Sequence, residues 1–263
     1  MVNYDVDLFD GIEIFFDALK AKSSTEAEYA AEILKARGFL LEDAELALSD
    51  NSHRDDARYL NELLTKDNLG YVEDNRIFLR PDANVEKIFY RDNRIGGEAF
   101  SNGISRKKFV HDSFAPKVPV RWLEPFVARY VKAISACGAE TWCSCDGNHP
   151  ETEQRILIEF TGKPNDLWHE LICKKLLVKR FNLSWSCGYS KIRFDKANKW
   201  RTYTELNRAA EFLYDNRLKL RQIRSEASNA ISLKMSKSLP ADELAKIFSE
   251  RANELFDELF KNA

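Results

Sequence analysis

The sequence predicts an α+β fold in three parts: an acidic helical N-terminal module, a central small and mainly antiparallel sheet with helices on one face, and a long C-terminal helical hairpin. Apolar residues recur at three- and four-residue spacing at both ends of the chain. Between residues 120 and 200 the patterns follow the order helix, strand, strand, helix, strand, which is typical of helices packed on one face of a sheet. We expect boundaries at residues 1–82, 83–119, 120–200 and 201–263.

The first module, residues 1–82, begins with helical patterns. An apolar stripe predicts a helix over residues 6–21. Ser23 and Glu26 have capping-box spacing and predict the start of a second helix, which Gly38 would end.

A third helix is expected from Ser52, followed by two short strands around Glu73-Asp74-Asn75. Three helices followed by a hairpin resemble a winged helix, which would be a DNA-binding module. A small helical domain or a protein–protein module is the alternative. The alternative is favoured by charge, because this region holds nineteen acidic and nine basic residues, and phosphate contacts need Lys and Arg.

Residues 83–119 show no sustained period, so we expect a connecting segment or a flap. From Arg121 a helix is predicted, with Gly138 as its stop. Two paired strands, one further helix and a third strand follow, at residues 140–145, 155–161, 164–177 and 183–194.

The C-terminal part, residues 201–263, predicts one long helix to about residue 233 and a last helix from Pro240. The two would form a helical hairpin or a dimerisation arm, so a protein partner or a homo-oligomer is a possible use of these helices.

Composition limits the class of protein. No apolar run approaches the roughly 20 residues that a membrane span needs, and the first residues carry acids where a signal peptide needs bases. We therefore expect a cytoplasmic protein without membrane contact. Five cysteines, an odd number, do not predict a disulfide framework.

Basic residues concentrate between Lys174 and Arg224, where fourteen bases face four acids. Aromatic residues interleave with these bases. Aromatic rings stack on bases while cations hold phosphates, so the stretch predicts a surface that binds nucleic acid, either DNA or RNA. The alternative is that the aromatics are core and the bases a solvated face. The expected contact residues are Lys191, Arg193, Lys196, Lys199, Trp200 and Arg201.

A group of thiols and one imidazole suggests zinc as a possible cofactor, with Cys143, Cys145, His149 and Cys187 as ligands. The spacing argues partly against it. Two strand residues at i and i+2 lie about 7 Å apart, which is long for two ligands of one tetrahedral ion. The alternative is that the cysteines are small core residues.

The turn after residue 145 suggests a catalytic or ligand site. Gly147 permits a positive φ, so Cys145, Gly147 and Asn148 could cradle an anion with backbone N–H groups. Asp146 and His149 would then supply acid–base chemistry.

The pattern Thr141-x-x-Ser144-Cys145-x-Gly147 resembles the Thr-Ser-Ser-Cys-x-Gly turn of the wybutosine tRNA methyltransferase family over about seven residues. The chain departs from that turn at Trp142 and Cys143, and by the inserted Asn148. The resemblance implies binding of RNA and S-adenosylmethionine.

The function that the sequence favours is nucleic-acid binding through the basic central and C-terminal surface. One alternative is an enzyme that acts on a nucleotide or nucleic acid at the Cys145–His149 turn. Another is a non-catalytic subunit of a larger assembly, held by the acidic module and the C-terminal helices.

Overall fold

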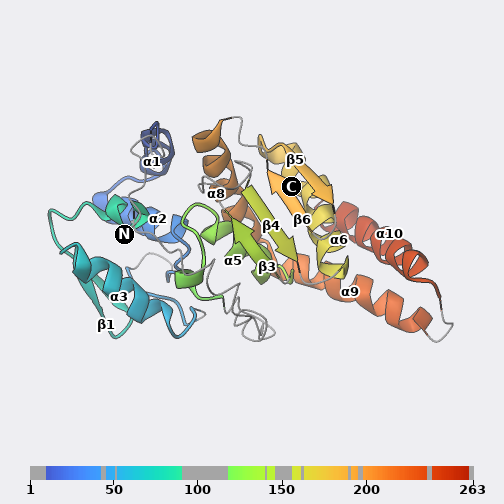
Figure 1. Ribbon diagram of the computed structural model, residues 1–263. Helices are drawn as coiled ribbons and strands as arrows, with labels where there is room; N and C mark the ends of the chain where they lie inside the picture. The colour runs from blue at the N-terminus through green and yellow to red at the C-terminus, as the bar shows by residue number, and fades with distance from the viewer. Residues whose placement is uncertain are drawn as a thin grey trace.

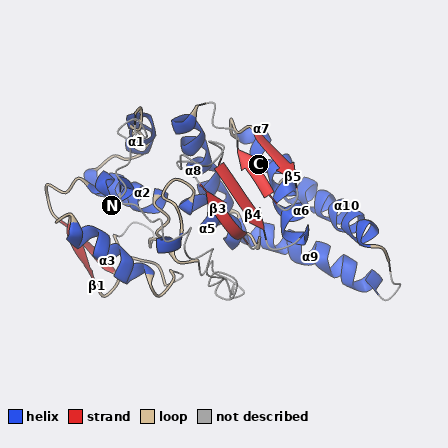
Figure 2. Ribbon diagram, in the orientation of Figure 1, coloured by secondary structure: helices blue, strands red, loops and turns tan. Residues whose placement is uncertain are grey.

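The structure is a computed structural model. It describes residues 10–42, 46–50, 52–90, 118–139, 141–145, 156–160, 163–188, 191–194, 198–235 and 239–260. The predicted α+β class is confirmed: a helical module with a hairpin lies at one side, a four-stranded sheet lies in the middle, and two long helices extend at the other side (Figure 1; Figure 2).

Helix α1 (Glu13–Lys20) is shorter than predicted, because a turn at Gly11, whose φ is +79°, precedes it. Helix α2 (Glu26–Ala36) also begins later than expected. Its N-cap is Thr25, whose hydroxyl accepts a hydrogen bond from the Glu28 N–H, so the predicted Ser23–Glu26 capping pair is wrong.

Helix α3 (Asp56–Lys66) packs on the hairpin of β1 (Gly70–Glu73) and β2 (Arg76–Leu79). The hairpin confirms the predicted turn, and both central residues, Asp74 and Asn75, have positive φ. The other edge of β2 meets residues 46–48, where the Leu46 carbonyl accepts from the Ile77 N–H. The predicted helix and hairpin are thus present, and the resemblance to a winged helix stays a prediction.

The predicted helix from Arg121 is divided. A 3₁₀ turn, η4 (Val120–Trp122), comes first, and α5 (Ala128–Ala136) follows. A second 3₁₀ segment, η2 (Val85–Tyr90), lies earlier, within the expected connecting segment. Helix α5 ends as predicted at Gly138, whose φ is +96°.

The central sheet is antiparallel with the order β3-β4-β6-β5. Its strands are β3 (Thr141–Cys145), β4 (Ile156–Phe160), β5 (Trp185–Gly188) and β6 (Lys191–Phe194). The single strand predicted over residues 183–194 is therefore wrong: β5 and β6 are two paired strands. The alternating pattern continued across Gly188, so it did not show where β5 ends.

One face of the sheet is covered by helices. Along β4, Ile156, Ile158 and Phe160 are buried, whereas the intervening Leu157 and Glu159 are partly exposed. Helices α5 and α6 (Lys163–Ile172) contact the sheet. A π-helical turn, η5 (Cys173–Leu177), and the short α7 (Val178–Arg180) extend α6.

The predicted long helix from residue 202 is two helices, α8 (Lys199–Asp215) and α9 (Arg217–Met235). Asn216 separates them, because its φ of −96° and ψ of 9° are not helical; its backbone N–H and its side-chain amide both donate to the Phe212 carbonyl. Helix α8 packs on α5, so the C-terminal hairpin consists of α9 and α10 (Ala241–Leu259).

The hydrophobic core continues from α1 to α10 without interruption. On α10, Phe256 stacks on Trp168 of α6 with ring centroids 5.6 Å apart, so this part of its apolar face is covered within the chain. Among the described helices, none combines the length and the apolar character that crossing a membrane requires.

Candidate nucleic-acid interface

The sheet register brings Cys145, where the predicted turn begins, and Arg193, a predicted contact residue, to the same end of the sheet. Cys145 is paired with Leu157, Leu157 with Arg193, and Arg193 with Ser186. This row crosses all four strands where β3 and β6 end and β4 and β5 begin. The chain therefore leaves β3 for the predicted turn at the end of the sheet where Arg193 lies, with β4 between β3 and the strand that carries Arg193.

Four residues separate the end of β6 from the start of α8. Asn198 is its N-cap, and the Asn198 side-chain oxygen accepts from the Arg201 N–H at 3.2 Å. The Thr202 hydroxyl donates to the Asn198 carbonyl at 3.0 Å. The capped first turn fixes the backbone from which Lys199 and Arg201 project.

A groove of about 330 Å³ lies at this first turn of α8. Its walls come from α1, from the segment before β5 and from α8, and we call it the α8 groove. Most of its lining is polar. The lining residues are Ile14, Ala18, Asn182, Ser184, Asn198, Arg201, Thr202, Thr204 and Glu205.

Among the described residues at this end of the molecule, exposed positive charge exceeds uncompensated negative charge. Arg193 and Arg201 are exposed. The one carboxylate among the groove residues, Glu205, accepts from the Asn182 N–H at 3.1 Å and from Arg208 at 2.7 Å, so its charge is already compensated. An incoming anion would meet arginine, amide and hydroxyl groups.

Trp200 does not fit its predicted role as a stacking surface. It is buried against Phe126 and Tyr203, and its indole N–H donates to the Asp10 carbonyl. Phe194 is also fully buried. For these aromatics the alternative interpretation, that they are core, is correct. The burial of Trp200 follows from the packing of α8 on α5 and α1, and Phe194 packs on Tyr130 of α5.

The sheet order separates the predicted zinc ligands. Cys143 and Cys145 lie on β3, at one edge, and Cys187 lies on β5, at the other edge. Three strand spacings amount to about 14 Å, so Cys187 cannot share one ion with the β3 cysteines. Among the residues that the structure describes, no group of three or more His, Cys, Asp or Glu side chains could hold a metal.

Several predicted site residues lie outside the described residues. These include the turn residues Asp146, Gly147, Asn148 and His149, together with Lys196. For Lys191 the structure gives the strand position, which is in register with Glu159 and Gly188.

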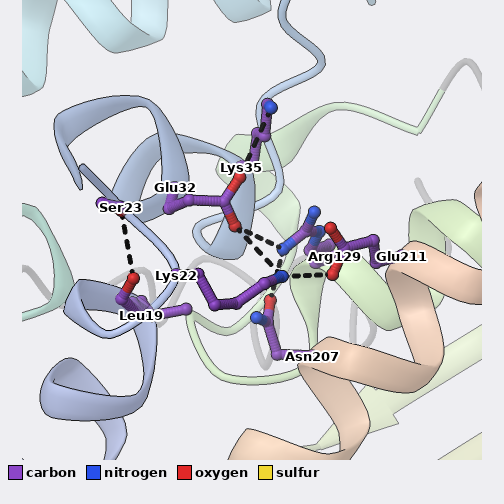
Figure 3. A network of polar contacts seen from close by, with 8 residues as sticks. All are labelled: Leu19, Lys22, Ser23, Glu32, Lys35, Arg129, Asn207 and Glu211. Atoms are coloured by element: carbon purple, nitrogen blue, oxygen red, sulfur yellow. Dashed lines mark hydrogen bonds and ion pairs between the residues drawn. The ribbon is translucent and has the colours of Figure 1, made fainter. Parts of the chain in front are cut away.

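A second cavity, also of about 330 Å³, lies between α2, α5 and the junction of α8 with α9. A polar network at its border joins four segments (Figure 3). Glu32 on α2 lies 3.5 Å from Arg129 on α5 and 3.7 Å from Lys22, and Arg129 donates to Asn207 on α8 at 3.0 Å. Burial alone would raise the pKa of Glu32, but the cations Arg129, Lys22 and Lys35 outweigh it and lower that pKa.

Beneath the sheet lies a buried cluster of Tyr130, His169 and Cys173. The Tyr130 hydroxyl is 2.7 Å from Nε2 of His169, and the Cys173 sulfur is 3.8 Å from the same nitrogen. Burial lowers the pKa of His169 to about 3 and raises the pKa of the Cys173 thiol. These groups are neutral at pH 7 and fully enclosed, so the cluster is suited to holding α5 and α6 together and not to reacting with a dissolved substrate.

Sequence reasoning missed one exposed feature, the aromatic pair Tyr71 and Phe78 on the β1–β2 hairpin. The two-residue turn at Asp74-Asn75 was the available signal. Counting outward from that turn places Tyr71 opposite Phe78, on the face away from Val72 and Ile77.

We compared the chain with protein-family models, with curated proteins and with solved structures, and none of the three comparisons found a match.

Proposed function

We propose that the protein binds nucleic acid at the end of the sheet where α8 begins, with Arg193 and Arg201 as the principal phosphate contacts. The observation that carries the proposal is that two exposed arginines lie close along the chain at this end of the sheet: Arg193 is the second-last residue of β6, and Arg201 is in the first turn of α8 and lines the α8 groove.

The chemistry of this surface supports phosphate binding. Guanidinium groups donate paired hydrogen bonds to phosphate oxygens. The groove adds the side-chain hydroxyl of Ser184 and the side-chain amide of Asn182, which are common donors to phosphate and sugar oxygens. Such contacts position a polynucleotide backbone and do not by themselves distinguish sequences.

The test is the salt dependence of binding, measured by fluorescence anisotropy with labelled oligonucleotides. The variant Arg193→Ala/Arg201→Ala should bind more weakly. On duplex DNA, its plot of log K against log salt should be shallower by about 1.8, because each lost phosphate contact removes about 0.9.

The control variant is Arg58→Ala/Lys246→Ala, which removes the same charge from exposed positions on α3 and α10. It should retain the wild-type slope. Equal slopes for the wild type and the Arg193/Arg201 variant, both folded, would exclude this surface as the binding site.

The row of paired residues from Cys145 to Arg193 favours one alternative, an enzyme acting at the Cys145–His149 turn. The chain leaves β3 for that turn at the end of the sheet where the proposed interface lies. The variant His149→Ala separates the two functions. An enzyme would lose turnover of its nucleic-acid substrate while retaining oligonucleotide affinity. A binding protein would show no turnover in either form, and methyl transfer from S-adenosylmethionine to RNA is the first reaction to assay.

A further inference from the structure

Two large aromatic side chains lie exposed and in contact on the β1–β2 hairpin. Tyr71 and Phe78 are cross-strand partners, with ring centroids 4.9 Å apart and planes inclined by 15°. Tyr71 is 48% exposed and Phe78 is 40% exposed. Each ring covers one π-face of the other, so the column of two rings is open to a further planar group.

The hairpin holds this pair rigidly. Its other face packs toward α3, with Ile77 in the core. Both edges of the hairpin are also fixed: the Asn61 side-chain oxygen accepts from the Val72 N–H at 2.9 Å, and the Leu46 carbonyl accepts from the Ile77 N–H at 2.7 Å. The rings therefore stand on a prearranged frame, which reduces the ordering that binding would require.

Cations lie before and after Phe78 in the sequence. Arg76 and Phe78 alternate on β2 and so point to the same side, about 7 Å apart. Arg80 is the first residue after the strand and lies 3.7 Å from Asp82. Arg80 is held in place by Asn68, whose Oδ1 accepts from Nη1 at 2.8 Å. Arg76 is exposed opposite Glu73. An aromatic ring between two arginines matches a base attached to a phosphate backbone.

We propose that this face of the hairpin, consisting of Tyr71, Arg76, Phe78 and Arg80, binds single-stranded nucleic acid by stacking an unpaired base on the ring column. The inference rests on the proposed function and extends it, because it supplies the aromatic surface that the buried Trp200 does not provide. An unpaired base offers a free π-face to the rings. A base within a duplex is already stacked on its neighbours.

The test compares three versions of the protein on a single-stranded oligonucleotide and on a duplex of the same length. Tyr71→Leu/Phe78→Leu keeps apolar side chains but removes the π-faces. Tyr71→Phe/Phe78→Tyr keeps both rings and serves as the matched control. Anisotropy gives the affinity, quenching of a 2-aminopurine base in the single strand reports stacking, and circular dichroism confirms folding.

We expect the leucine variant to lose roughly 5- to 100-fold in affinity for the single strand, corresponding to one stacked base. Its salt slope and its duplex affinity should stay at wild-type values, its 2-aminopurine quenching should disappear, and the ring-swap variant should match the wild type. Unchanged single-strand affinity in the leucine variant would overturn the inference, as would an equal loss on the duplex.

The outcomes for the two surfaces are separable. If Arg193→Ala/Arg201→Ala weakens binding and the leucine variant does not, the proposed interface stands and the hairpin inference fails. If only the leucine variant weakens binding, the hairpin is the contact and the interface at α8 is excluded. A wild-type protein that binds neither oligonucleotide overturns both.

Discussion

The Nζ atom of Lys132 lies 2.6 Å from Oδ2 of Asp56, and both side chains are 1% exposed. The pair joins α5 to the first residue of α3. Asp56 accepts two further hydrogen bonds, from the Val120 N–H at 2.9 Å and from the His53 N–H at 3.2 Å. Burial lowers the pKa of Lys132, and the Asp56 carboxylate opposes that effect.

Breaking this pair should be costly. Lys132→Met or Asp56→Asn should each lower the free energy of unfolding by about 3–5 kcal/mol, because each leaves one buried charge unpaired. The double variant Asp56→Asn/Lys132→Met should be more stable than the sum of the single losses implies. Urea unfolding measures all three, with Arg58→Ala on the exposed side of α3 as a control. Additive losses would contradict the direct coupling.

The buried imidazole of His169 predicts a pH dependence of stability. Its folded pKa, about 3, lies below the unfolded value near 6.5, so the unfolded chain binds the proton more readily. Its contribution to stability is present above pH 6.5 and is lost progressively as the pH falls toward 3, by up to about 1.4 kcal/mol per pH unit. His169→Gln should lack this component. Urea unfolding between pH 7 and 4 would show a smaller decline for the variant, and parallel declines would count against the assignment.

The described cysteines should differ in how fast their thiols are alkylated. Cys137 and Cys173 are fully buried, and burial raises the pKa of both thiols, so they should resist alkylation in the folded protein. Cys187 is exposed and should be modified first among these three. Brief treatment with iodoacetamide followed by peptide mass spectrometry tests the order. Early labelling of Cys173 would indicate that the core beneath the sheet opens.

Two glycines should differ in their tolerance of a side chain. Both Gly38 and Gly138 have φ near +100°, which costs an L-residue about 1–2 kcal/mol. A Cβ on Gly38 would lie 2.8 Å from the Cβ of Ala128, whereas a Cβ on Gly138 would meet the movable end of Arg224. Gly38→Ala should therefore lower the melting temperature more than Gly138→Ala. The reverse order would show that α2 can shift against α5.

The sequence by itself determined the features that depend on neighbouring residues. Positive φ is well tolerated by Asp and Asn, so Asp74-Asn75 fixed the first hairpin, and Gly138 ended α5 for a similar reason. The apolar run within residues 155–161 identified β4 as a strand. The exposure of Arg193 and Arg201 agrees with the predicted basic surface, whose binding of nucleic acid stays a prediction.

Only the tertiary structure decided the features that depend on distant partners. The alternating pattern is the same whether residues 183–194 form one strand or two, and the strand order alone separates Cys187 from Cys145. Trp200 is buried although it lies between Lys199 and Arg201 in the sequence, whereas Tyr71 is exposed although it lies between Gly70 and Val72. Local periodicity in the sequence indicates which face of a helix or strand is apolar. Which faces are then covered depends on how elements far apart in the chain pack together.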